Sequence, residues 1–191
     1  GQTFVLLTGG IDLSVGSNIA LTGMFAALTM AAGFPWWVAV IVALLVGAAV
    51  GLFNGVIVHY LKLPPFIVTF ATFGITASIP KILTNAQSVN IEDPMFAVIG
   101  RGSLGGIPTP VILVVIALLI FMFILHRTPF GVHLYAVGGN KETSRLAGIN
   151  ISRVTITAYV VSGICAVFGG LITMSRLMVG YPSAGSGNEQ F

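Results

Sequence analysis

One carboxylate lies inside an otherwise apolar stretch near the amino terminus, in the sequence LTGGIDLSVGS at residues 7–17. The paired glycines Gly9 and Gly10 favour a break in a helix, and a new helix can begin near Ser14. Asp12 is therefore placed to accept hydrogen bonds from amide groups that lack partners at the helix start. The alternative is that the break exposes Asp12 to a solute path, as for many acids within membranes. Both interpretations stay open.

Further polar side chains follow two prolines in the sequence PPFIVTFATFGITASIP. At about 100° per residue, threonines 69, 72 and 76 share one helical stripe, and phenylalanines 66, 70 and 73 share the neighbouring stripe. Hydroxyl groups beside aromatic faces suit a polyhydroxylated solute. Alternatively, the threonines bond carbonyls of their own helix and the phenylalanines face lipid. Asn54 is expected to form an interhelical hydrogen bond. The candidate pathway residues are Asp12, Ser14, Asn54, Phe66, Thr69, Phe70, Thr72 and Phe73.

The composition indicates which solvent surrounds these residues. Hydrophobic residues make up 56% of the chain and charged residues 7%, whereas charged residues are about a quarter of an ordinary soluble domain. The chain is therefore an integral membrane protein, and its apolar segments are expected to be helices because open strands leave backbone groups unpaired in lipid. The sequence predicts an all-α, polytopic transmembrane helix bundle with about five spans. The predicted spans cover residues 13–32, 36–59, 66–80, 107–125 and 154–175.

The basic residues of the connections predict the orientation of the spans. The connection at residues 126–153 contains four basic residues and one acid, which places it in the cytoplasm. The connection at residues 81–106 balances two basic residues with two acids, which places it outside. In the second span Gly47, Gly51 and Gly55 form a small-residue pattern that lets another helix approach closely, so this span is expected to be central.

The connection at residues 126–153 contains a short helix of its own. Asn140 is placed to cap it, Glu142 lies in its first turn, Arg145 lies toward its end and Gly148 follows at a stop position. A solvated linker would not need capping and complementary charges. The sequence therefore predicts a helix of about two turns outside the membrane, between the fourth and fifth spans.

Several functional classes are disfavoured. The histidines at positions 59, 126 and 133 lie at segment ends or in a connection, so no catalytic serine–histidine pair is expected, and no metal or cofactor site is predicted. The net charge of +3 comes from scattered residues, which does not indicate nucleic-acid binding. An ion-coupled secondary transporter of small polar solutes is the alternative, although Asp12 is the only acid in a predicted segment.

Four stretches in this order and spacing resemble the permease subunit of bacterial ABC importers of the ribose, xylose and galactose type: LTGGIDLSVGS, LPPFIVTFAT, RTPFGVHLYAVGGNKETSRLAGINISRV and YPSAGSGNE. The resemblance implies a transport subunit in the bacterial inner membrane, not an enzyme. It implies an ATPase subunit that hydrolyses ATP, a second permease copy, a periplasmic or lipid-anchored sugar-binding protein and a sugar substrate. The ATPase-coupling residues that it implies are Gly139, Asn140, Glu142, Thr143, Arg145 and Leu146.

Two departures from this family concern the ends of the chain. The family usually continues after Glu189 with further helices, whereas Gln190 and Phe191 follow here, and an opening helix is also missing. We therefore expect a single permease domain over residues 1–191 that is a fragment of a longer chain, with residues 126–153 as its coupling connection. The sequence does not identify the sugar or the composition of the permease pair.

Overall fold

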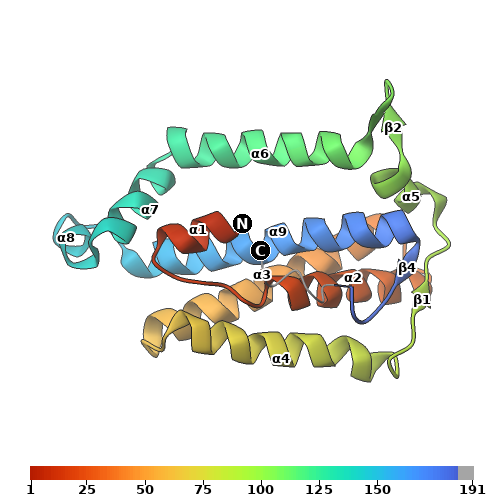
Figure 1. Ribbon diagram of the computed structural model, residues 1–191, viewed down its shortest axis with the longest axis horizontal. Coiled ribbons are helices and arrows are strands. Elements are labelled where there is room, and N and C mark those ends of the chain that lie inside the picture. The colour runs from red at the N-terminus through yellow and green to blue at the C-terminus, as the bar shows by residue number, and fades with distance from the viewer. Residues whose placement is uncertain (185–191) are drawn as a thin grey trace.

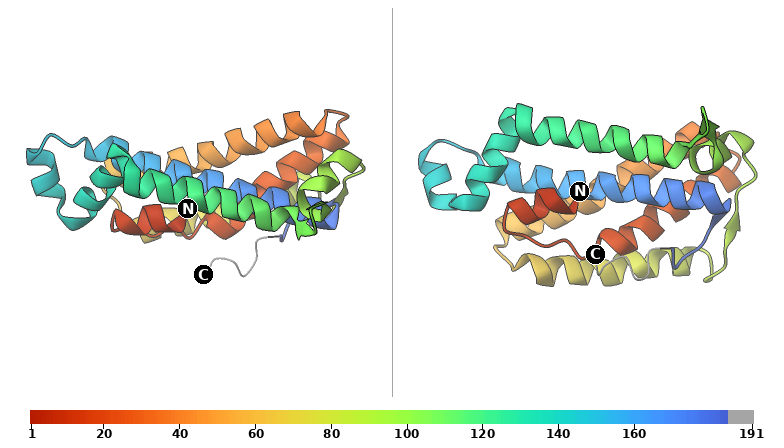
Figure 2. Two further views of the ribbon diagram at one scale, coloured as in Figure 1. Left: turned by 90° about the horizontal axis from the view of Figure 1, so that it is seen from above. Right: turned by 45° about the horizontal axis from the view of Figure 1, so that its top comes forward.

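The computed structural model describes residues 1–184, in which the long helices run side by side in one bundle (Figures 1 and 2). Glu189 and the residues around it lie outside the described part. The elements in chain order are α1 (Gln2–Leu7), α2 (Val15–Ala31), α3 (Trp36–Tyr60), α4 (Pro65–Leu83), β1 (Val89–Asn90), α5 (Pro94–Arg101), β2 (Ser103–Leu104), β3 (Ile107–Pro108), α6 (Thr109–Arg127), α7 (Pro129–Gly139), α8 (Lys141–Leu146), α9 (Ile151–Leu177) and β4 (Val179–Gly180).

The helical bundle predicted from the sequence is confirmed. Within residues 1–184, four helices are long and apolar enough to cross a membrane: α3, α4, α6 and α9. The remaining predicted span corresponds to α2, a shorter apolar helix of 17 residues. Short strands pair as two antiparallel ribbons, β1 with β4 and β2 with β3, at the end of the bundle opposite α8 (Figure 1).

Several predicted span boundaries differ from the observed ones by up to three residues; α4, for example, ends at Leu83 and not at Pro80. Ile107 and Pro108 belong to β3, so the fourth span begins at Thr109. The fifth span begins at Ile151, three residues earlier than Val154, because the Asn150 side chain caps it: Asn150 Oδ1 accepts a hydrogen bond from the Arg153 amide at 3.0 Å.

Two helices in the connections were not predicted. Helix α5 begins where Asp93 Oδ1 accepts hydrogen bonds from the amides of Met95 and Phe96 at 2.8 and 3.4 Å. Helix α7 begins where Thr128 Oγ1 accepts a hydrogen bond from the Gly131 amide at 3.4 Å. A proline follows each cap at the first helical position, where its fixed φ favours the helix. The capping residue followed by proline was therefore a usable sequence signal in both connections.

The packing of α3 against α9 depends on glycine. A Cβ at Gly51 would collide with the backbone carbonyl of Tyr159, and one at Gly55 would lie 2.8 Å from the Ile156 Cα. Gly163 of α9 lies just as closely against the Gly47 carbonyl. The small-residue pattern therefore brings two backbones together, as predicted for α3. Both helices also pack against α2. Helix α9 has further neighbours in α1, α5, α7 and α8, whereas α3 packs additionally against α4.

Helix α6 lies at the edge of the bundle. None of its residues is buried, and it packs on α7 at one end and on α5 and β3 at the other. In Figure 1 it runs along α9 while remaining apart from it over most of its length.

Candidate functional site

The chain breaks between α1 and α2, at the glycines that the sequence indicated. Gly9 has φ +78°, a left-handed conformation that glycine adopts without steric cost. Gly10 lies against α9, where a Cβ would be 2.6 Å from the Tyr159 hydroxyl oxygen. The Gln2 carboxamide, oriented with its nitrogen toward Asp12 O, pairs with the Asp12 backbone oxygen and nitrogen at 3.2 and 3.3 Å. The break is therefore held by both α1 and α9.

The Asp12 carboxylate is buried, with only 4% of the residue exposed, and its oxygens accept three hydrogen bonds. Oδ1 accepts from the Ser14 amide at 3.0 Å and from the Ser14 hydroxyl at 2.6 Å. Oδ2 accepts from the Ser162 hydroxyl of α9 at 2.8 Å. Hydrogen bonds to the charged form offset the cost of removing a carboxylate from water.

The position of Asp12 refines the capping hypothesis. Ser14 is the residue that precedes α2, and its own side chain makes no capping hydrogen bond. Asp12 instead accepts the Ser14 amide from two residues upstream and reaches across to α9. Its carboxylate therefore supports the start of α2 from outside the helix and also joins two segments. A place for Asp12 in a solute path stays a prediction.

A chain of hydrogen bonds continues from Asp12 to α4. Asn54 Nδ2 donates to Ser14 Oγ at 2.9 Å, and the Thr72 hydroxyl donates to Asn54 Oδ1 at 2.6 Å. Asn54, Ser14 and Thr72 are buried. Asn54 thus forms an interhelical hydrogen bond on each side of its amide. The network, which we call the Asp12 network, consists of Asp12, Ser14, Asn54, Thr72 and Ser162.

The threonine and phenylalanine rows of α4 face different surroundings. Thr69, Thr72 and Thr76 are buried, and each hydroxyl lies within 3.0 Å of the carbonyl oxygen four residues earlier. Phe66 and Phe70 are more than half exposed, and Phe70 stacks with Phe66 on one side and with Phe73 on the other, at centroid distances of 6.0 and 6.3 Å. The two rows therefore do not share one exposed surface in this structure, and their role in a pathway stays a prediction.

Several polar residues near the break were not singled out from the sequence. Ser162 completes the Asp12 network, and Ser17 lies 2.6 Å from the Thr76 hydroxyl. Within residues 1–184, the buried Asn18 Oδ1 and Tyr159 hydroxyl are the polar side-chain atoms without a hydrogen-bond partner. Polar residues in apolar segments were a signal available in the sequence, but their spacing does not indicate which of them meet.

The short helix α8 has the features that the sequence predicted. Asn140 Oδ1 accepts a hydrogen bond from the Thr143 amide at 3.0 Å, and Gly148 has φ +81° just beyond the helix. Glu142 and Arg145 form an ion pair of 3.3 Å on its exposed surface. Leu146 is 84% exposed. Figure 1 shows α8 beyond the ends of the long helices, between α7 and α9.

The other two predicted coupling residues, Gly139 and Thr143, lie in the same part of the molecule. Gly139 is the last residue of α7, and Thr143 is exposed on α8. Helix α7 is anchored to the bundle because its Leu134 and Val137 are buried in a cluster with Phe4 of α1 and Val154 of α9. The six predicted coupling residues therefore lie at the end of the packed helix α7 and along the exposed helix α8.

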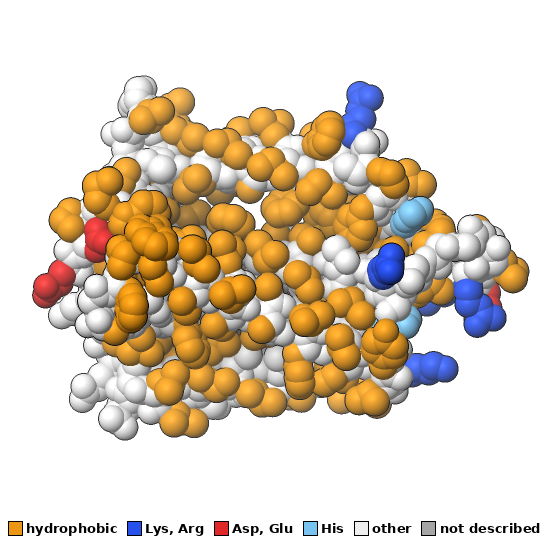
Figure 3. Space-filling view, turned by 180° about the vertical axis from the view of Figure 1, so that it is seen from behind, with side chains coloured by type: hydrophobic (Ala, Val, Ile, Leu, Met, Phe, Trp, Pro, Cys, Tyr) orange, Lys and Arg blue, Asp and Glu red, His pale blue; other side chains and the backbone are white. Residues whose placement is uncertain are grey.

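Charged side chains are distributed unequally between the two ends of the bundle. The face shown in Figure 3 has most of its basic side chains at the α8 end, and its acidic side chains lie mainly at the opposite end. A cleft of about 740 Å³ lies at the α8 end between the α3–α4 turn and the α8–α9 connection.

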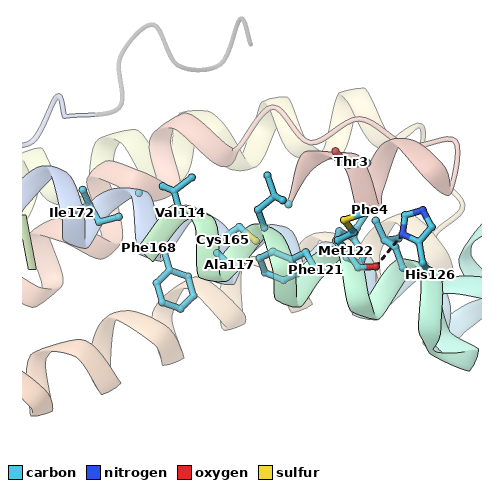
Figure 4. A pocket seen from close by; sticks show the side chains of 14 residues that line it. Thr3, Phe4, Val114, Ala117, Phe121, Met122, His126, Cys165, Phe168 and Ile172 are labelled. Carbon is cyan, nitrogen blue, oxygen red and sulfur yellow. Dashed lines mark hydrogen bonds between the residues drawn. The ribbon is translucent and has the colours of Figure 1, made fainter. Parts of the chain in front are cut away.

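A separate groove of about 640 Å³ lies between α6 and the pair α1 and α9. Figure 4 shows its side chains, which are mainly apolar, including Phe121 of α6 and Phe168 of α9. The His126 ring is engaged within α6, since Nδ1 lies 2.9 Å from the Met122 carbonyl oxygen. The groove offers few groups to bind sugar hydroxyls, so it does not have the properties of a sugar site.

Residues 1–190 match the family model described as branched-chain amino acid transport system / permease component. The chain is 38% identical to the ribose import permease protein of Haemophilus influenzae, over 99% of this chain and 60% of that protein. It is 38% identical to the D-allose transport system permease protein of Escherichia coli, over 100% of this chain and 59% of the relative. It is 37% identical to the galactofuranose transporter permease protein of Escherichia coli, over 93% and 52%.

The chain thus spans about three fifths of the length of the first two of these relatives. No solved structure matches the chain at a significant level.

Proposed function

The chain belongs to the family of permease components of branched-chain amino acid transport systems, and on this premise we propose that it forms the solute pathway of an ATP-binding cassette importer. Its place is the bacterial inner membrane, which it crosses several times. A permease component is a transport subunit, not an enzyme, and ATP hydrolysis belongs to a separate ATPase subunit. The family and the relatives give no support to an ion-coupled transporter.

The substrate that we propose is a monosaccharide such as ribose. Three relatives from two organisms are named for ribose, allose and galactofuranose. All three are polyhydroxylated sugars, so the proposal is made at the level of the sugar class. The partners proposed with it are a sugar-binding protein on the outside and a second permease copy.

The structure of helix α8 is the observation that best supports this function. An importer must convert closure of its ATPase subunit into movement of membrane helices, and a short rigid element between two spans can transmit that movement. Asn140 caps α8, Glu142 and Arg145 pair on its surface, and the exposed Leu146 offers an apolar contact. We propose that residues 126–153 are the cytoplasmic coupling connection of one permease domain, with α8 docking into the ATPase.

The pathway is proposed to lie beside α4. The stacked rings of Phe66, Phe70 and Phe73 present flat apolar faces on its outer side, which suit the carbon faces of a sugar. Behind them, Asp12, Ser14, Asn54, Thr69 and Thr72 join the helix break to α4. In this proposal the buried hydroxyls and the carboxylate reach the solute only when α4 moves away from α2 and α3.

The test is charge reversal on α8 in the full-length transporter, reconstituted in proteoliposomes with its ATPase and binding protein. Glu142→Lys and Arg145→Glu are each expected to leave insertion and binding-protein docking intact while uncoupling ATP hydrolysis from sugar uptake. Lys81→Glu is the matched control, because this exposed residue lies at the other end of the bundle. A cysteine at position 143 should also crosslink to the ATPase. Normal uptake in both charge-reversal variants, with no crosslink from any position between 140 and 147, would show that α8 only connects two helices.

A further inference from the structure

The cleft at the α8 end has an uneven charge. Its lining includes Lys62, Lys141, Arg145 and His59, against the single acid Glu142. In the described part of the chain the only ion pair is the one between Arg145 and Glu142, at 3.3 Å. Two lysines of the cleft, one from each wall, therefore have no acidic partner there.

The cleft lies where apolar helices begin and end, which is where the surface of a membrane is expected. Helix α3 ends at Tyr60, α4 begins at Pro65 and α9 begins at Ile151, so the ends of three apolar helices meet at this level. The cleft is also lined by apolar residues, including Val58, Leu63 and Ile151. Unpaired cations therefore lie directly beside apolar side chains, as a headgroup with attached acyl chains would require.

The backbone of Lys62 supports a role for its side chain. Lys62 has φ +54°, in the left-handed region that glycine and asparagine occupy more readily than lysine. Such conformations persist where the surroundings or a function require them. The turn thus places a long basic side chain at a position where a smaller residue would cost less.

We propose that this cleft binds the headgroup of an anionic phospholipid from the leaflet at the α8 end, with the phosphate between Lys62 and Lys141. Basic pockets between membrane helices bind such headgroups, because the anionic leaflet surface attracts basic residues beside the spans. The apolar residues of the cleft favour a lipid over a free phosphate ion. A zwitterionic headgroup would bring its own cation toward the two lysines, so selectivity for anionic lipid is expected.

Native mass spectrometry of the full-length protein in detergent tests whether the cleft binds anionic phospholipid. Dioleoylphosphatidylglycerol or dioleoylphosphatidylcholine is titrated, and the number of retained lipids is counted. Lys62→Gln and Lys141→Gln should each lower the apparent affinity for phosphatidylglycerol about fivefold. Both lysines are exposed, so each variant is expected to fold normally, and its thermal midpoint checks this. Lys81→Gln removes the same charge from the other end of the bundle and should change the affinity less than about twofold.

Four outcomes would overturn the proposal. They are unchanged phosphatidylglycerol retention in the Lys62→Gln/Lys141→Gln double variant, an equal loss in Lys81→Gln, equal retention of phosphatidylcholine, and complete displacement of the lipid by inorganic phosphate. If the double variant retains lipid but loses the ATPase subunit during purification, the cleft is a protein contact. That result would leave the proposed transport function standing while rejecting the lipid site.

Discussion

The Ser162 hydroxyl donates a hydrogen bond of 2.8 Å to Asp12 Oδ2, across a separation of 150 residues in the sequence. The same carboxylate accepts the amide and hydroxyl of Ser14 through its other oxygen. One buried acid therefore joins the start of α2 to the middle of α9. Because the three donors are themselves buried, replacing the acid tests whether its charge or its hydrogen bonding matters.

We expect Asp12→Asn to retain expression and most uptake in the full-length protein, since the amide oxygen still accepts from Ser14 and the Ser162 hydroxyl can reorient. Asp12→Leu should lower the free energy of unfolding by about 1–3 kcal/mol for each buried donor left unpaired, which is measurable as a lower thermal midpoint in detergent. Ser162→Ala removes one donor and should have a smaller effect. An Asp12→Asn variant that folds normally but transports nothing would show that the charge itself is required.

Close packing of α3 on α9 makes a second prediction. Gly51→Ala forces a methyl group against the Tyr159 carbonyl, so it should destabilise the protein by about 1–3 kcal/mol. Gly74→Ala is the matched control, because a Cβ at Gly74 of α4 meets nothing within 4 Å. That variant should be neutral or slightly stabilised, since alanine favours a helix. Equal thermal midpoints for the two variants would contradict the close contact.

The orientation of the chain in the membrane leads to a third prediction. In a Cys165→Ala background, a cysteine at exposed Thr143 should react with a membrane-impermeant thiol reagent only from the cytoplasmic side. A cysteine at exposed Ser103 should react only from outside. Labelling of intact cells and inverted vesicles measures both. The reverse pattern would reject the orientation derived from the basic residues.

The cap of α8 makes a fourth prediction. Asn140→Ala removes the acceptor of the Thr143 amide, which should cost the helix about 0.5–2 kcal/mol and speed amide hydrogen exchange in α8. Asn140→Asp keeps an acceptor oxygen and should exchange at nearly the original rate. The amides of α9, capped separately by Asn150, serve as the internal reference. Equal exchange rates in the alanine and aspartate variants would show that α8 does not depend on this cap.

The sequence by itself determined the features that depend on local chemistry and on the membrane. Long apolar runs must be helical in lipid, which predicted the spans, and Asn140 and Gly148 indicated both ends of α8. The glycines at 47, 51 and 55 indicated a close helix contact, since only a missing side chain permits one. The helices α5 and α7 were missed although a capping residue followed by proline begins each of them.

Only the tertiary structure decided which polar groups meet. The spacing of the α4 threonines predicted a shared stripe, and one of the two interpretations had the neighbouring phenylalanines facing outward. The spacing did not predict that Thr72 binds Asn54. Ser162 was indistinguishable in sequence from other small residues of α9, and its partnership with Asp12 arises from the packing of α9 against the break. Lys62 and Lys141 likewise share a cleft only because α3 ends and α9 begins at the same end of the bundle. Helical periodicity determines the face on which a side chain lies, whereas the element packed against that face follows from the whole arrangement of helices.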